Sequence, residues 1–281
     1  MSVFQAIILG IIQGLTEFLP ISSSAHLLFA RWIMGWGEGM TERQELTFDV
    51  ALHAGTLLAI VLYFRRDLLA LIAGIMASLR DRDVNSEPNR RLAWFIVLAT
   101  LPAALFGYFG ERAIEEHLRV PALASAAMIL LALFLLLAER TGRRAVELKK
   151  ITLRDSLIIG LAQTLALVPG VSRSGVTITA GLFCGLTREA AARFSFLLGA
   201  PITAGAVVFK VGELLHQGVA ESERLPFIFG ILSSGLVGLL SIWFLLRYLR
   251  THTTHIFIWY RVVLGGLLLG LLFLGVLDPR L

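Results

Sequence analysis

The sequence has few charged residues: Asp, Glu, Lys and Arg make up 16% of its 281 positions, whereas ordinary soluble domains carry about a quarter. Apolar residues are correspondingly frequent, at 57%, and the mean hydropathy is +0.79. A soluble core could not bury this much apolar surface without exposing the rest to water. The composition therefore excludes a disordered chain, a disulfide scaffold and most soluble enzymes, and it predicts an integral membrane protein.

Cysteine is almost absent. Cys184, which lies in an apolar stretch, is the only one, so the chain can form neither an internal disulfide nor a cysteine metal cluster. We interpret it as a small packing residue. The sequence also lacks the HExxH, CxxC, GxSxG and Walker patterns, so none of these signatures assigns a function.

Negative charge is in deficit, since the net charge is +5 and the isoelectric point is near 9.9. Such a balance would suggest nucleic acid if the basic residues formed one face. Here they gather in a few loops between apolar runs, so no nucleic-acid partner is expected. We interpret these loops as a signal of membrane orientation.

Six apolar runs are long enough to cross a bilayer. A spanning helix needs about 20 mostly apolar residues, because each residue rises about 1.5 Å through a hydrocarbon core about 30 Å thick. The runs cover residues 48–64, 92–110, 120–138, 194–209, 225–246 and 255–277. The sequence therefore predicts an all-α polytopic membrane protein with about six transmembrane helices.

Two further apolar regions, 2–30 and 157–186, are each divided by a polar break that contains proline. Their pieces are too short to span a membrane. Backbone can leave the helix at membrane depth only where protein or a water-filled cavity satisfies its polar groups. We predict that both regions are re-entrant helix–loop–helix hairpins.

The two hairpin regions match at an offset of 150 residues. The matched pairs are Gly10 and Gly160, Gln13 and Gln163, Ser22 and Ser172, and Ser24 and Ser174. Each hairpin precedes three predicted spans, and an odd number of crossings inverts the second half relative to the first. We predict a single membrane domain, 1–281, built from repeat 1 (about 1–140) and repeat 2 (about 151–281) in an inverted-topology repeat, with the functional site where the hairpins meet.

Basic residues set the orientation. They are concentrated between the first two spans (65–91), after the third span (140–154) and before the last span (247–250). With six spans, all three connections lie on one side of the membrane, which the positive-inside rule makes cytoplasmic. The first hairpin then opens to the outside.

The first hairpin carries polar residues that a spanning helix would avoid. Glu17 follows Gln13 by one helical turn, and Ser22-Ser23-Ser24-Ala25-His26 comes after the proline. An ionisable group at membrane depth costs at least about 2.5–3.5 kcal/mol on insertion scales. Serine, histidine and carboxylate are the parts of an activated nucleophile or an acid–base pair. The alternatives are a glutamate at the membrane interface, a serine that caps a helix and a histidine packed in the core. For His53, which lies in the next predicted span, we favour packing or a supporting role.

The second hairpin carries Ser172-Arg173-Ser174-Gly175, followed by Thr177. An arginine between serines and glycines at the start of a helix is well suited to bind phosphate. The guanidinium can contact two phosphate oxygens, and the serine hydroxyls can donate hydrogen bonds to others. Glycine lets the backbone approach the phosphate closely. The alternative is a turn whose arginine extends to lipid head groups.

The motifs QxxxE (13–17), SSSAH (22–26) and PGVSRSGVT (169–177) closely resemble those of the undecaprenyl-diphosphate phosphatases, the bacitracin-resistance membrane phosphatases. The resemblance implies hydrolysis of undecaprenyl diphosphate in the bacterial inner membrane, at a site open to the periplasm. It further implies recycling of the lipid carrier for peptidoglycan synthesis and bacitracin resistance. A transporter or lipid flippase on the same architecture is the alternative.

Carried over by position, the resemblance implies the following roles. The catalytic residues are Glu17, Ser23, His26 and Arg173; the substrate-binding residues are Ser22, Ser24, Ser172, Ser174, Gly175 and Thr177; and Glu17 with Gln13 would bind a divalent cation, Mg²⁺ or Ca²⁺. Gln13 stands where some family members have a second glutamate. The nucleophile stays open between Ser23 and His26. The partners expected are the polyprenyl diphosphate and membrane lipids. A homodimer stays open, because the sequence does not determine the oligomeric state.

Overall fold

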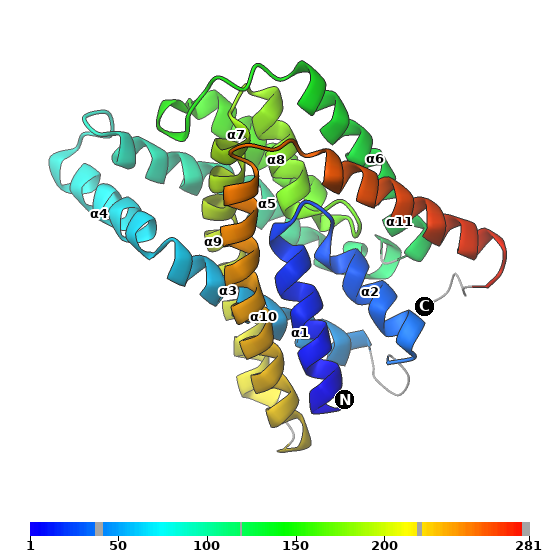
Figure 1. The fold of residues 1–281 in the computed structure, drawn as a ribbon. Helices are drawn as coiled ribbons and strands as arrows, with labels where there is room; N and C mark the ends of the chain where they lie inside the picture. Colours follow the sequence, from blue (N-terminus) through cyan, green and yellow to red (C-terminus); the bar gives the residue numbers. More distant parts are fainter. Residues whose placement is uncertain (37–41, 119, 218–220, 277–281) are drawn as a thin grey trace.

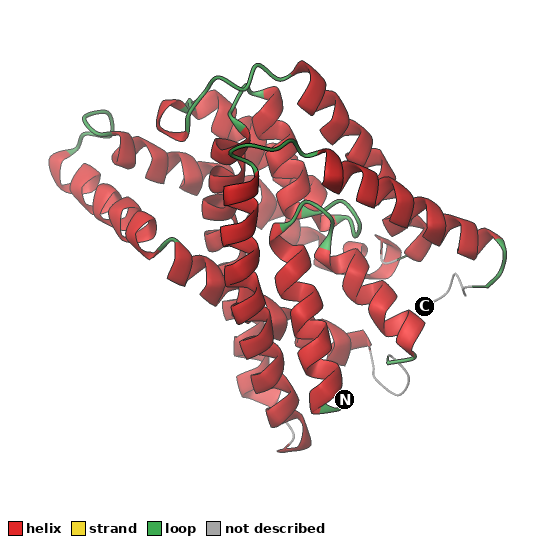
Figure 2. Ribbon diagram, viewed as in Figure 1, coloured by secondary structure: helices red, strands yellow, loops and turns green. Residues whose placement is uncertain are grey.

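The computed structural model describes residues 1–36, 42–118, 120–217 and 221–276, and within these ranges it contains helices and no strand (Figure 2). The helices are α1 (Val3–Phe18), α2 (Ser23–Met34), α3 (Glu42–Tyr63), α4 (Arg65–Asp81), α5 (Pro88–Leu118), α6 (Pro121–Thr141), η1 (Leu148–Lys150), α7 (Leu153–Gln163), η2 (Thr164–Leu167), α8 (Arg173–Phe183), α9 (Arg188–Gln217), α10 (Glu221–Tyr248) and α11 (His255–Phe273). The all-α prediction is confirmed.

Six of these helices are long and apolar enough to cross a membrane: α3, α5, α6, α9, α10 and α11. They are the six that the apolar runs predict, so this expectation is confirmed. The last one ends at Phe273, and the predicted end at residue 277 lies outside the described residues. Large apolar side chains such as Phe106 on α5 and Leu236 on α10 are exposed, as expected for surfaces that face lipid.

Both predicted hairpins are pairs of short helices joined by a break. The first consists of α1, with 16 residues, and α2, with 12; the second consists of α7 and α8, with 11 residues each, and the short η2. None reaches the length of about 20 residues that a bilayer requires. The breaks have the same backbone conformation, since Ser22 and Ser172 both have positive φ, at 79° and 74°. The depth of the hairpins in a membrane and the inverted orientation of the repeats stay predictions.

The helix α4 was not predicted. The sequence indicated only a basic connection between the first two spans, but residues 65–81 form a 17-residue helix. Its Gly74 and Ser78 face α5, and Trp94 of α5 donates a hydrogen bond to the Ser78 hydroxyl at 2.7 Å. The second half has no equivalent, since only residues 218–220 separate α9 from α10.

Small residues bring the first hairpin close to α10 (Figure 1). A Cβ added to Gly14 would lie 2.5 Å from the Ser234 carbonyl oxygen, and one added to Gly10 would lie 2.5 Å from the Gly230 carbonyl oxygen. Glycine and serine therefore let the two backbones pack closely, as in other helix pairs in membranes. This contact places the end of α1 inside the bundle.

A buried carboxylate joins three helices away from the hairpin breaks. Glu139, near the end of α6, is 2% exposed and accepts hydrogen bonds from Arg188 Nε of α9 and from Thr254 Oγ1 at the start of α11, both at 2.8 Å. Arg144 completes the group at 3.0 Å. These contacts fix the ends of α6, α9 and α11 relative to one another.

Candidate active site

The breaks of the two hairpins touch each other inside the bundle. Ser174 Oγ donates to the Leu19 carbonyl at 3.0 Å, and the Gly170 amide donates to Ser24 Oγ at 3.5 Å. Residues about 150 positions apart thus form one polar cluster between α1, α2 and α8.

Glu17 is the centre of this cluster. It lies at the end of α1 and is 6% exposed. Its Oε1 accepts a hydrogen bond from Arg173 Nη2 at 2.8 Å, and its Oε2 accepts one from Ser23 Oγ at 2.7 Å. Gln13 Nε2 also donates to Oε2, at 3.1 Å. A carboxylate, a hydroxyl and a guanidinium from both hairpins therefore meet at one point.

Ser23 and Arg173 occupy equivalent places in the two hairpins. Each is the first residue of its helix, α2 or α8. The first N–H groups of a helix lack partners within the helix and carry its positive dipole end. Two helix N-termini therefore border Glu17, and such termini favour anions.

The predicted substrate-binding serines divide into caps and site residues. Ser22 and Ser172 are the N-caps of α2 and α8, and their hydroxyls accept from the amides of Ala25 and Gly175. Each hydroxyl also hydrogen-bonds the serine two positions later, at 3.2 Å in both hairpins. Ser24 is exposed whereas Ser174 is buried, so Ser24 is the one that a ligand reaches directly.

Thr177 points away from Glu17. Its hydroxyl contacts Ser195 Oγ of α9 and donates to the Arg173 carbonyl, both at 2.7 Å. These contacts connect the first turns of α8 to α9. Among the described hydrogen bonds, none joins Thr177 to Glu17 or Ser23.

The His26 ring contacts Ser22 and Tyr260 rather than Glu17. Its Nδ1 lies 2.6 Å from the Ser22 carbonyl, which can only accept, so Nδ1 carries the proton. Its Nε2 lies 2.7 Å from the Tyr260 hydroxyl, and the two rings stack with centroids 5.6 Å apart. Within the described residues, no hydrogen bond links His26 to Glu17, Ser23 or Arg173.

His53, for which the sequence favoured packing or a supporting role, borders the cluster. Its Nε2 lies 3.6 Å from Glu17 Oε2, while its Nδ1 donates to the Asp49 carbonyl at 2.7 Å. The ring is about a third exposed. The packing of α3 against α1 brings the His53 ring to the carboxylate.

Gly199 of α9 is a residue near the site that the sequence did not indicate. The Arg173 guanidinium lies against it, and a Cβ at this position would collide with Nη1. Arg173 Nη1 and Gln13 Oε1 are buried without a hydrogen-bond partner in the described part of the chain. Unpaired buried polar atoms are rare, so a free donor and a free acceptor beside one carboxylate suggest a polar ligand.

The donor set suits a divalent cation only in combination with a phosphate ligand. No group of three His, Cys, Asp or Glu side chains that could hold a metal occurs among the described residues. Gln13 Oε1 and the Glu17 carboxylate supply two kinds of oxygen ligand. Magnesium is commonly bound through one or two carboxylates together with substrate phosphates, so these residues fit an ion shared with a phosphate.

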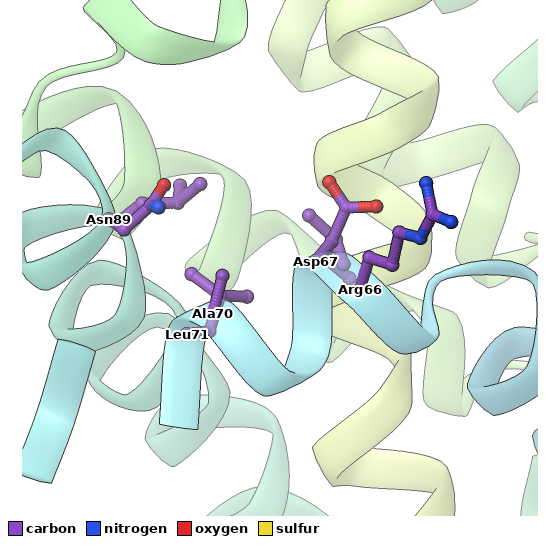
Figure 3. Close-up of a pocket in the computed structure, with 7 residues that line it drawn as sticks. Arg66, Asp67, Ala70, Leu71 and Asn89 are labelled. Carbon is purple, nitrogen blue, oxygen red and sulfur yellow. The ribbon is translucent and has the colours of Figure 1, made fainter. Parts of the chain in front are cut away.

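A pocket of about 200 Å³ lies elsewhere, among α4, the start of α5 and α9 (Figure 3). Its lining residues are Arg66, Asp67, Ala70, Leu71, Asn89, Leu92 and Leu197. None of them belongs to a hairpin, and Asp67 already pairs with Arg193. The cluster around Glu17 is therefore the better candidate for a catalytic site.

These features define a polytopic membrane protein in which carboxylate, serine and arginine meet between two broken helix pairs. The family described as "Bacitracin resistance protein BacA" matches residues 6–267 of the chain, and the chain belongs to this family. The resemblance seen in the motifs is confirmed.

Curated relatives are similar over nearly their whole length. The chain is 47% identical to an undecaprenyl-diphosphatase of Geobacter sulfurreducens over 97% of this chain and 99% of that protein. It is 46% identical to one of Rubrobacter xylanophilus, over 98% and 100% of the two chains. For one of Thermomicrobium roseum the identity is 45%, over 96% and 98%.

Proposed function

We propose that this protein hydrolyses undecaprenyl diphosphate to undecaprenyl phosphate and inorganic phosphate. The observation that carries the proposal is the meeting of Glu17, Ser23 and Arg173 between the hairpins. The names of the curated relatives support the same substrate. The apolar helix surfaces around the hairpins suit a polyprenyl chain that stays in lipid.

In the proposed complex, Arg173 binds the diphosphate. Its Nη1 has a free donor, and a guanidinium can contact two phosphate oxygens at once. Ser24, which is exposed, and the N-termini of α2 and α8 supply further donors. Phosphoryl transfer depends mainly on such positioning and charge neutralisation.

Ser23 is the favoured nucleophile. Its Oγ already donates to Glu17 Oε2 at 2.7 Å, within the reach of a general base. Ser23 Oγ would form a bond to the terminal phosphorus while the bond to undecaprenyl phosphate breaks, and Glu17 would take the hydroxyl proton. Water would then hydrolyse the phosphoserine. His26 is less well placed, because both of its nitrogens have other partners.

Gln13 and Glu17 would hold a divalent cation, Mg²⁺ or Ca²⁺, in this proposal. When bound, the ion would offset the negative charge of the diphosphate. The residues themselves bind and orient the phosphate and accept the serine proton.

The proposal includes a place in the cell. The protein would act in the bacterial inner membrane, with the site open to the periplasm and the basic loops in the cytoplasm. Removing the terminal phosphate would recycle the lipid carrier for peptidoglycan synthesis and confer bacitracin resistance. The family description is consistent with that resistance.

The test is phosphate release from undecaprenyl diphosphate by the purified protein. We expect release by the wild type, and loss of nearly all of it in Ser23→Ala. Ser233→Ala is the matched control, because the Ser233 hydroxyl, in the described part of the chain, bonds carbonyls of its own helix at 2.8 and 3.0 Å and no residue of the site. No release by the wild type, or full activity of Ser23→Ala, would contradict the proposal.

Transport of a lipid phosphate is the second candidate, because pairs of broken helices are typical of transporters. Reconstituted Ser23→Ala vesicles separate the two functions. A flippase would still move a labelled polyprenyl phosphate between leaflets, whereas a dedicated phosphatase would not.

A further inference from the structure

Arg261 of α11 is an unusual residue for the inside of a membrane protein. It is 0% exposed and is one of the largest fully buried side chains in the described part of the chain. No described carboxylate forms an ion pair with it. A buried charge in a membrane protein is costly and usually serves a function.

The guanidinium is satisfied entirely by backbone carbonyls from three segments. Nη1 donates to Pro20 O of the first hairpin at 3.1 Å. Nη2 donates to Gly170 O and Val171 O of the second hairpin at 2.9 and 3.1 Å. Nε donates to Met128 O of α6 at 3.0 Å. One side chain therefore joins both hairpin breaks to the surrounding bundle.

The three hairpin carbonyls, those of Pro20, Gly170 and Val171, need a partner because they lie outside helices. The helices α1 and η2 end at Phe18 and Leu167, and the last carbonyls of a helix and those just after it have no helical donor. Inside a membrane protein, water does not freely replace that donor. Pro20 and Gly170 are also equivalent at the offset of 150, so Arg261 contacts corresponding points of the two hairpins.

The same carbonyls are close in sequence to the site residues. Pro20 is three positions after Glu17 and three before Ser23, and Gly170 is three positions before Arg173. The second loop also lies close to α6, since a Cβ on Gly170, with φ of +90°, would collide with the Ala124 carbonyl. A change in the anchor would therefore move the backbone that carries the site residues.

We propose that Arg261 is a positioning residue: it holds the two hairpin breaks at a fixed separation, so that Arg173 and Ser23 both reach Glu17. It does not contact the substrate. Its effect on turnover rests on the proposed phosphatase function, whereas its effect on the hairpin separation does not.

The first experiment measures the separation directly. Spin labels are attached to cysteines at Leu15 and Leu165 in a Cys184→Ala background, because these two residues are exposed, equivalent in the two hairpins and outside the site. We expect Arg261→Gln to shift or broaden the distance distribution between the labels and Arg261→Lys to do so less. Arg90→Gln is the control, because Arg90 is also buried and bonds Asp81 rather than the hairpins. An unchanged distribution in a folded Arg261→Gln protein would overturn the proposal.

The second experiment measures turnover. We expect Arg261→Gln to lower kcat by about 10²-fold with little change in KM, since a misplaced catalytic group costs rate more than binding. In the double variant with Arg173→Lys, the loss of kcat should be smaller than the sum of the two single losses in free energy, because both changes disturb the contact between Arg173 and Glu17. Fully additive losses in the double variant, or wild-type kcat in Arg261→Gln, would overturn the proposal.

Failure of both Arg261→Gln and Arg261→Lys to fold would also overturn it, because Arg261 would then be a residue required for folding. If the wild type releases no phosphate, the proposed function fails and the label distances still decide the role of Arg261.

Discussion

Arg173 Nη2 lies 2.8 Å from Glu17 Oε1, although the two residues are 156 positions apart. The contact joins the start of α8 to the end of α1, and so it exists only when both hairpins are in place. Ser23 approaches the other oxygen of the same carboxylate from the start of α2. Glu17 thus connects a nucleophile candidate to a phosphate-binding candidate, and the predictions below test this connection and its surroundings.

Arg173→Lys should lose most phosphatase activity despite keeping its charge, because an ammonium cannot make the planar two-pronged contact of a guanidinium. A charge-assisted pair of this kind is worth about 1.5–3 kcal/mol, or roughly tenfold to over a hundredfold in kcat/KM. Arg193→Lys is the control, because Arg193 pairs with Asp67 away from the hairpins. Near-normal kcat/KM in Arg173→Lys would show that Arg173 does not bind the phosphate.

Gly199→Ala should reduce turnover without weakening the fold. The added methyl group would displace the flexible Arg173 guanidinium, and a small misplacement can cost about 10²-fold in rate. Alanine also favours the helix more than glycine does. Gly205→Ala on the same helix is the control, because its Cβ would meet nothing within 4 Å. Equal kcat values for the two variants would contradict the placement of Arg173.

Glu17→Gln should weaken metal activation if Glu17 binds a divalent cation, because a neutral amide is a poorer ligand than a carboxylate for hard cations. Activity should then recover in part at high Mg²⁺ or Ca²⁺. If Glu17 serves only as the general base for Ser23, the loss should be about 10²–10⁴-fold and added cation should not reverse it. A metal titration of the purified variant, with the exposed Glu147→Gln as control, measures how much activity the cation restores. A plateau that added cation cannot raise would count against the metal role.

The predicted orientation can be checked by labelling in intact cells. In a Cys184→Ala background, Ser222→Cys should react with an impermeant thiol reagent, because the start of α10 is expected to face the outside. Ser86→Cys, between α4 and α5, should resist the reagent. Both serines are exposed and the substitutions are identical. The opposite pattern would overturn the topology together with the outward-facing site.

Glu139→Gln should destabilise the fold rather than the chemistry. The buried carboxylate pairs with Arg188 and accepts from Thr254, and breaking a buried pair costs about 3–5 kcal/mol. For the more exposed pair of Glu189 and Arg250, Glu189→Gln should cost much less, because water and salt screen the charges. Denaturant unfolding in detergent micelles measures both, and equal losses would show that Glu139 is not a structural centre.

Part of the site could be anticipated from local sequence alone. Glu17, Ser23 and Arg173 stood out because each is polar in an apolar, proline-broken segment, and polar groups at membrane depth are expensive. A serine that caps a helix could also be anticipated, because a serine directly after a break is a common N-cap; Ser22 and Ser172 are these caps. The helix α4 escaped notice because its uncharged stretch, residues 68–79, is too short to span a bilayer. The arginines at both of its ends also resemble a basic connection.

The sequence by itself determined the membrane class, the six helices long enough to span and the two broken pairs of short helices, because the length of an apolar run and the place of a break are local properties of the chain. Only the tertiary structure decided which polar groups meet. His26 and Glu17 lie in one hairpin, yet His26 pairs with Tyr260 of α11, while His53 of α3 approaches Glu17. The reason is that helix packing sets the distances between segments, and no local pattern encodes those distances. Gly14 of α1 packs against α10, and Gly199 of α9 packs against the Arg173 guanidinium.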